Sequence, residues 1–216
     1  MKGQTQAVTA VLVTGIVVGG IGTAYLWGIP KLHKRQVKQD VSSTEHDVTN
    51  LYSEIVSISK QGSGASSTVT VKADNIKVNE KKDYIQITNK LDQPAKQGFT
   101  WSLLKGDSFQ NTSIVNAGAY GIKGDEQPGI VAFKSSGGSG SSEITYRVEF
   151  RNLCLKNTHK LSKIDLQTAG QKRAAGSAKV KITNKGDQTD NRVAISQGAC
   201  RGTPSRTNKV VQISFE

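Results

Sequence analysis

The feature that most constrains this chain is an uncharged block near its N-terminus. Residues 7–29 read AVTAVLVTGIVVGGIGTAYLWGI, which is 23 positions without a charged side chain. Because an apolar helix needs about 20 residues to cross a bilayer, this length predicts a membrane-spanning or filament-core helix. Tyr25 and Trp27 stand near its end, where an aromatic belt would meet the lipid headgroups.

Glycines mark one face of that predicted helix. Gly15 and Gly19 form a GxxxG pair, and Gly22 continues the same face. Without side chains there, a second helix can approach closely and pack by van der Waals contact. We therefore predict helix–helix assembly through this face, although glycine is also generally frequent in membrane helices.

An amphipathic pattern follows over residues 30–60. Apolar and small side chains recur there with alternating spacings of four and three, as in a heptad stripe. The members of the stripe are Val37, Val41, Thr44, Val48, Leu51, Ile55 and Ile58. Either this helix lies on the domain that follows, or it extends the first helix and bundles with copies of itself. Under the second interpretation its apolar members are assembly residues: Val37, Val41, Val48, Leu51, Ile55 and Ile58.

A glycine- and serine-rich linker, residues 61–67, ends the helical pattern. From residue 68 to residue 216 the period changes to two, and ten short strand candidates alternate with Gly, Asn, Asp and Ser turns. Residues 80–83 and 184–187 have the composition of hairpin turns. The predicted fold class is α+β: a long N-terminal hydrophobic helix followed by an antiparallel β-sandwich, immunoglobulin-like or jelly-roll-like.

Motifs for chemistry are missing from the sequence. The three histidines have no cysteine or carboxylate neighbours at metal-ligand spacing. No GxSxG elbow, phosphate-binding GxxxxGK[ST] or helix-opening GxGxxG occurs. We therefore predict no catalytic, cofactor-binding or metal-binding residue, no cofactor, and a protein that is not an enzyme.

Two further features depend on where the β-rich domain resides. Cys154 and Cys200 are the chain's two cysteines, and in an oxidising location they are predicted to form a disulfide. The alternative is two unpaired thiols. Asn111 begins an Asn-Thr-Ser triplet, an acceptor for N-glycosylation on an exported protein.

The formal net charge of +12 favours anionic partners. The basic residues are spread along the predicted strands and do not alternate with aromatic residues, so nucleic acid is not an expected partner. The simplest interpretation is a solvated basic face. The other is contact with an anionic envelope or surface-layer component.

The order of these parts resembles the archaeal type IV pilin and archaellin superfamily. The resemblance rests on a short signal-like leader (residues 1–6), the apolar helix that follows at once, the amphipathic extension and the β-rich head. Lys2-Gly3-Gln4 is similar to a class III prepilin cleavage site, which implies processing between Gly3 and Gln4. Many pilins carry glutamate at the fifth mature position, and this chain has Val8 there.

The resemblance implies a structural subunit of a cell-surface filament, a homo-oligomer that polymerises through its N-terminal helix with the β head outside. The alternative is a single-pass membrane anchor whose extracellular sandwich binds an envelope or surface-layer component. Both place the chain in the membrane or in an extracellular filament. The basic residues after the apolar block argue for the opposite orientation, with the head inside; they are Lys31, Lys34, Arg35 and Lys38.

Overall fold

The computed structural model describes residues 2–91, 98–106, 120–122, 127–137, 140–155, 160–190 and 205–216. One helix, α1 (Lys2–Ser59), precedes all the strands. The chain forms two compact units, residues 1–43 and residues 44–216. The second unit therefore contains the last turns of α1 together with the whole sheet.

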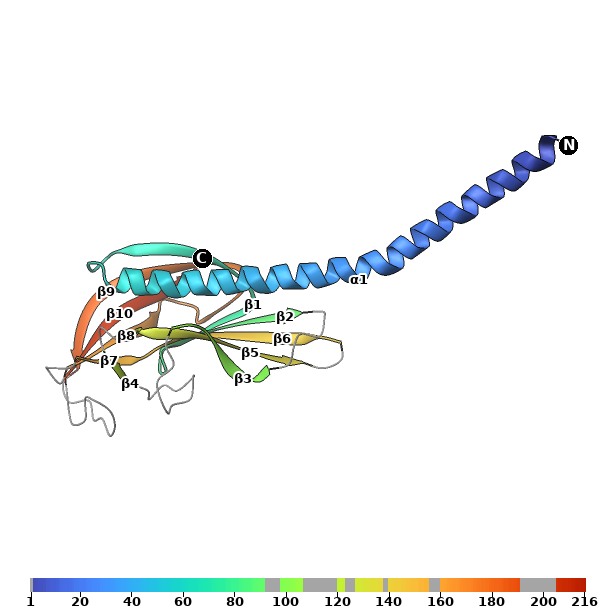
Figure 1. The fold of residues 1–216 in the computed structure, drawn as a ribbon. Helices are drawn as coiled ribbons and strands as arrows, with labels where there is room; N and C mark the ends of the chain where they lie inside the picture. The colour runs from blue at the N-terminus through green and yellow to red at the C-terminus, as the bar shows by residue number, and fades with distance from the viewer. Residues whose placement is uncertain are drawn as a thin grey trace. The chain divides into compact units, whose positions relative to one another are not determined.

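Among the described residues, ten strands make one sheet, in the order β3-β5-β6-β2-β1-β9-β10-β8-β7-β4 (Figure 1). Their bounds are β1 (Ser66–Asn79), β2 (Tyr84–Leu91), β3 (Gly98–Lys105), β4 (Tyr120–Ile122), β5 (Gly129–Gly137), β6 (Ser142–Phe150), β7 (Asn152–Leu155), β8 (Lys160–Thr168), β9 (Arg173–Asp190) and β10 (Arg206–Phe215). The alternation of buried and exposed side chains along β1 and β9 is the period-two pattern expected of strands with one dry face.

The predicted fold class is wrong in two respects: the share of helix and the direction of the strands in the sheet. The structure is mostly β rather than α+β with a long N-terminal hydrophobic helix. Its sheet is mixed and not antiparallel throughout, because β10 pairs with β8, and β4 with β7, in parallel. Periodicity reports which face of a strand is buried, but it says nothing about the direction of the neighbouring strand.

The two predicted hairpin turns have different outcomes. Residues 80–83 do form the turn between β1 and β2, and Asp83 takes the left-handed backbone conformation there (φ 49°). Residues 184–187 do not turn, because β9 continues through them. The β9–β10 pairing instead shifts register between Val210 and Val211. An extra residue inserted into a strand pair bends the strand without ending it.

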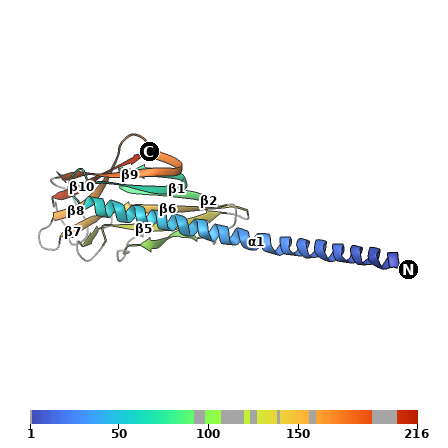
Figure 2. The same cartoon turned by 90° about the horizontal axis from the view of Figure 1, so that it is seen from above.

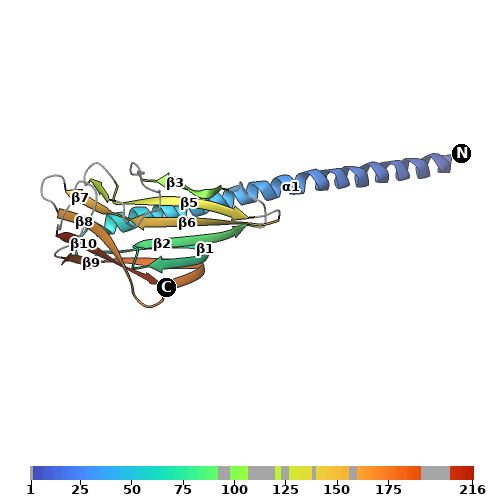
Figure 3. The same cartoon turned by 90° about the horizontal axis from the view of Figure 1, so that it is seen from below.

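The sheet curves around the last turns of α1. Strands from distant places in the strand order contact this helical segment, including β6 through Phe150 and β9 through Asn184. Figures 2 and 3, viewed from above and from below, show the cyan end of α1 lying along the sheet. The concave face of the sheet therefore forms most of the hydrophobic core around one helix.

Side chains from both the helix and the sheet fill this core. Val48, Leu51 and Ile55 of α1 are completely buried. The largest fully buried side chains elsewhere come from strands: Ile76, Ile85, Ile87, Ile130, Tyr146, Phe150, Leu161, Leu166, Ile182 and Ile213. Burying a large apolar side chain contributes about 1.5–3 kcal/mol, so this helix–sheet contact stabilises the second unit substantially.

An asparagine from the sheet caps the end of α1. The last carbonyls of a helix have no partners within it. Asn184 Nδ2 donates to the carbonyl oxygens of Ile58 (3.0 Å) and Gln61 (2.7 Å), and Asn184 Oδ1 accepts from the Gly186 N–H (2.7 Å). Gly64 then reverses the chain toward β1 with a φ of 90°, a conformation that glycine adopts without steric cost.

The predicted membrane span is also wrong. Across the portions of α1 with described side chains, no helical stretch combines the length and apolar character that crossing a bilayer requires. This finding contradicts the single-pass membrane location and conflicts with the pilin-like description, for which a long apolar helix was the central feature.

Candidate functional site

Residues 11–23 of α1 present an unusual surface for the first compact unit. Their large apolar side chains are between 51% and 74% exposed, and they are Val11, Leu12, Val13, Ile16, Val17, Val18 and Ile21. At 100° per residue these seven positions are spread around the helix, and the one wide gap between them, about 100°, holds Gly15, Gly19 and Gly22. A helix that is apolar all round is normally buried on every side, whereas the described residues of this chain leave this segment exposed.

The glycine face predicted from the sequence lies open on this segment. A Cβ atom placed on Gly15, Gly19 or Gly22 would meet no atom within 4 Å. Gly20, on the other side of the helix, is equally open. Thr23 Oγ1 donates to the Gly19 carbonyl within the helix (2.7 Å), which satisfies this hydroxyl locally. The face can therefore accept the close approach of a second helix.

The amphipathic stripe has a different environment. Val48, Leu51, Ile55 and Ile58 are 0–3% exposed, and their own chain buries them. They are not available to a second helix, so the structure supports the interpretation in which this helix lies on its own domain. Val37 and Val41, earlier in the stripe, keep intermediate exposure.

Tyr52 shows how the sheet holds this helical segment. Its hydroxyl donates to the Gly129 carbonyl of β5 (3.1 Å), and its ring stacks on Phe150 with centroids 6.0 Å apart. The Lys105 ammonium lies 5.4 Å from the same ring centroid. Gly129 is required here, since a Cβ would lie 2.6 Å from the Glu149 carbonyl oxygen and 3.2 Å from Tyr52 Cε2.

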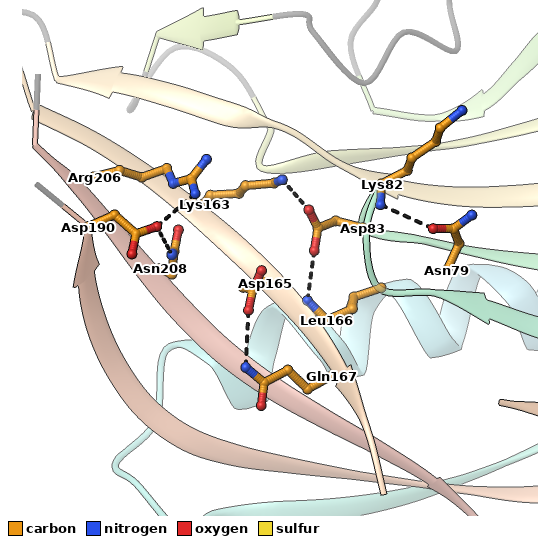
Figure 4. Close-up of polar contacts among 10 residues, drawn as sticks. All are labelled: Asn79, Lys82, Asp83, Lys163, Asp165, Leu166, Gln167, Asp190, Arg206 and Asn208. Atoms are coloured by element: carbon orange, nitrogen blue, oxygen red, sulfur yellow. Dashed lines mark hydrogen bonds and ion pairs between the residues drawn. The ribbon is translucent and has the colours of Figure 1, made fainter. Parts of the chain in front are cut away.

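A second group of interest joins the β1–β2 turn to β8 (Figure 4). Asp83, at the end of the turn, forms an ion pair with Lys163, and its other carboxylate oxygen accepts from the Leu166 N–H at 3.0 Å. The side chain of Asp83 is 3% exposed and that of Lys163 is 12% exposed. Burial raises the pKa of the Asp83 carboxyl, and the Lys163 charge and the Leu166 N–H oppose that rise.

Glu149 of β6 lies beside this turn. It is 1% exposed and stands opposite Tyr84 in the β2–β6 register. Neither carboxyl oxygen has a hydrogen-bond partner among the residues that the structure describes, and Arg147 Nη1 lies 4.0 Å from one of them. Burial raises the pKa of Glu149, while the positive charges of Arg147, Arg151, Lys163 and Lys82 act against that rise. A buried carboxyl group without hydrogen bonds is costly when ionised.

The neighbouring pair Glu80–Lys172 differs from Glu149 in its exposure and in its hydrogen bonds. Glu80 Oε1 accepts from the Thr168 N–H (2.8 Å) and the Thr168 hydroxyl (2.5 Å), and its other oxygen pairs with Lys172. The Lys172 and Glu80 side chains are 59% and 31% exposed. The hydrogen bond from Lys172, followed by that from Thr168, lowers the pKa of Glu80 to about 2. This carboxylate is therefore ionised and hydrated.

Two other polar groups stabilise sheet strands. Asp190 accepts from Arg206 Nη2 and Asn208 Nδ2, both at 2.7 Å, and these bonds lower its pKa (Figure 4). In the other half of the strand order, the Arg147 guanidinium carbon lies 4.3 Å from the Tyr84 ring centroid and 4.8 Å from that of Trp101. Cation–π contacts of this kind contribute about 0.5–2 kcal/mol, and this one links β2, β6 and β3.

Of the other residues singled out from the sequence, some lie within the described part of the chain and others outside it. Gly3 and Gln4 fall within the bounds of α1, whereas Asn111 and Cys200 lie outside the described residues. Cys154, in β7, is disulfide-bonded. In the described portions, no cluster of three or more His, Cys, Asp or Glu could hold a metal ion.

The sequence interpretation overlooked the group formed by Asp83, Lys163 and Glu149. The three residues come from separate strands or turns, 80 positions apart in the case of Asp83 and Lys163. No local motif joins them. The one available signal was Asp83 itself, an aspartate at a turn position between two strands.

Comparison with known proteins adds no relative. No protein-family model, no curated protein and no solved structure matches this chain.

Proposed function

We propose that this protein is a structural subunit that assembles with copies of itself into a cell-surface filament through residues 11–23 of α1. The sheet domain is the outward-facing head of each subunit. No catalytic step is assigned to either compact unit.

One observation carries the proposal: residues 11–23 are apolar on all sides and exposed in the single chain. Burying seven such side chains at about 1.5–3 kcal/mol each would contribute on the order of 10–20 kcal/mol. Association costs roughly 4–15 kcal/mol in lost freedom of motion, so the gain is large enough to drive assembly. Burial on every side requires several neighbouring helices rather than one, which favours a multi-helix bundle over a dimer.

Identical copies are the simplest partners for this segment. Gly15, Gly19 and Gly22 let two such helices approach closely, and each copy offers both the glycine face and the larger side chains that would pack against it. A heterologous contact, in which two different faces of identical copies meet and the rotation does not close, generates a helical filament.

The head contributes a basic surface in this arrangement. Lys72, Lys179 and Lys181 are exposed on neighbouring positions of β1 and β9. An anionic envelope component is the partner that this charge would favour.

The test is assembly of the full chain, observed by electron microscopy and sedimentation. The Gly15→Leu/Gly19→Leu variant places two large side chains on the glycine face and should abolish filaments. The matched control is Gly20→Leu, which adds the same side chain to an equally open position away from that face. Because neighbouring helices would also contact this side, we expect Gly20→Leu to weaken assembly, but less than the double variant does.

Two results would overturn the proposal. The first is a wild-type chain that stays monomeric at every concentration tested. The second is a double variant whose filaments are as abundant and as long as those of the wild type. Circular dichroism of both variants establishes that the sheet domain is folded.

A further inference from the structure

The buried pair Asp83–Lys163 and the adjacent Glu149 are an arrangement that structural stability alone does not explain. Replacing a buried ion pair by apolar side chains is often neutral or stabilising. Glu149 is a third buried ionisable group, and its carboxyl oxygens have no hydrogen bond among the described residues. We infer that Lys163 and Asp83 condense into an intramolecular amide cross-link, with Glu149 carrying the proton during the reaction. This inference does not depend on filament assembly.

The geometry brings the reacting atoms together. Lys163 Nζ contacts Asp83 Oδ2 in the ion pair. The Asp83 carbonyl accepts from the Phe150 N–H at 2.9 Å, which fixes the turn against the residue that follows Glu149. Tyr84, the residue after Asp83, is the register partner of Glu149. Two reacting groups held in contact by the fold gain the large rate advantage of an intramolecular reaction.

Burial favours the reactive protonation states. An ammonium cannot act as a nucleophile, and a carboxylate is a poor electrophile. In a site of low polarity, moving one proton from the Lys163 ammonium to the Asp83 carboxylate removes two buried charges and leaves a neutral amine beside a carboxylic acid. The burial that raises the pKa of Asp83 acts in this direction.

The reaction balances without any co-reactant. The Lys163 Nζ lone pair attacks Asp83 Cγ and forms the C–N bond. Asp83 Oδ2 then departs as water, taking up the two hydrogens that the nitrogen and the carboxyl group release. No atom is oxidised or reduced, and the products are one secondary amide and one water molecule.

A backbone donor stabilises the developing negative charge. The Leu166 N–H donates to Asp83 Oδ1 at 3.0 Å, so this oxygen is held while Oδ2 contacts the amine. A preorganised N–H aimed at the oxygen on which charge develops lowers the barrier to attack. Oδ1 would remain as the carbonyl oxygen of the amide.

Glu149 suits the role of proton carrier. Its carboxyl group is buried, and its oxygens are not engaged by hydrogen bonds among the described residues, so both can exchange a proton. Burial raises its pKa above the ordinary value of a glutamate, which favours the protonated form that can donate a proton. Glu149 is unchanged at the end of the reaction.

The nearby pair Glu80–Lys172 lacks the burial on which the proposed reaction depends, so no cross-link is expected there. Lys172 is 59% exposed, and the pKa of Glu80 is lowered to about 2, so the Glu80 carboxylate is ionised beside a lysine that faces water. The Thr168 hydroxyl and N–H hold the other Glu80 oxygen. This pair serves as an internal control beside the same turn.

The experiment is peptide mass analysis of the full chain after unfolding, reduction and alkylation. The expected result is a branched peptide containing Asp83 and Lys163 and lighter than the sum of its two parts by one water. Recovery of only the two separate linear peptides, with Lys163 open to amine-reactive labelling and to trypsin, would overturn the inference.

Variants distinguish chemistry from folding. Lys163→Arg keeps the positive charge and should eliminate the branched peptide, whereas the matched control Lys172→Arg should retain it in full. Glu149→Gln should be folded by circular dichroism but lose at least nine-tenths of the cross-link, and Glu149→Asp should restore part of it. Full cross-linking in Glu149→Gln would refute the role of Glu149.

Discussion

The two apolar parts of α1 differ in how their side chains are distributed around the helix. Residues 11–23 carry large apolar side chains around most of the helix, with glycines on the remaining face, and these side chains are exposed. The last turns carry them on one side, at Val48, Leu51, Ile55 and Ile58, and the sheet of the same chain buries them. The angular distribution, rather than the amount of apolar surface, indicates whether a helix packs on its own domain or needs several neighbours.

The largest expected difference between the two parts is in the stability of a single chain. Leu51→Ala removes a side chain that is 0% exposed, which should lower the free energy of unfolding by about 2–5 kcal/mol. Leu12→Ala removes a side chain that is 58% exposed and should change it by less than about 0.5 kcal/mol. Denaturant unfolding in the Gly15→Leu/Gly19→Leu background measures both without a contribution from assembly. Equal effects would contradict the comparison.

Substituting one glycine in each region tests the same difference in packing. In Gly129→Ala the new Cβ would lie 2.6 Å from the Glu149 carbonyl oxygen, so we expect a loss of about 1–3 kcal/mol from overpacking. In Gly15→Ala the Cβ meets nothing within 4 Å, and alanine's higher helix propensity should leave the monomer unchanged or up to about 1 kcal/mol more stable. Thermal unfolding of the two variants under identical conditions should show a loss of stability for Gly129→Ala and none for Gly15→Ala. A destabilised Gly15→Ala monomer would mean that this face is already packed.

The smallest predicted difference between the two regions is the change in stability at acid pH. Residues 11–23 contain no ionisable side chain, whereas the sheet domain contains Glu80, whose pKa is lowered from 4.5 to about 2. A lowered pKa contributes stability above the ordinary value, and this contribution is lost as the pH falls through 4.5 toward 2. The effect is small because Glu80 is partly exposed and water screens its charge. Unfolding between about pH 5 and pH 2 should be less pH-dependent in Glu80→Gln. An unchanged pH dependence would show that Glu80 does not contribute to the loss of stability in acid.

Local patterns predicted the elements better than their arrangement. The helical periodicity through Ile58 and the linker after it agree with the end of α1 at Ser59. The turn at residues 80–83 was also predictable from its composition. The continuation of β9 through residues 184–187 was not, because Asn184 is engaged by the end of α1, and a turn-like composition does not reveal that contact.

The sequence by itself determined the periods: an apolar block, a one-sided helical stripe, and alternating strands with Gly- and Asn-rich turns. These depend on residues a few positions apart, so neighbouring side chains are enough to reveal them. Only the tertiary structure decided that the stripe is buried by its own sheet, that two strand pairs are parallel, and that Asp83 meets Lys163 beside Glu149. Those contacts join residues distant in the chain, and they form because the curved sheet must bury its apolar face on a helix while pairing its buried charges.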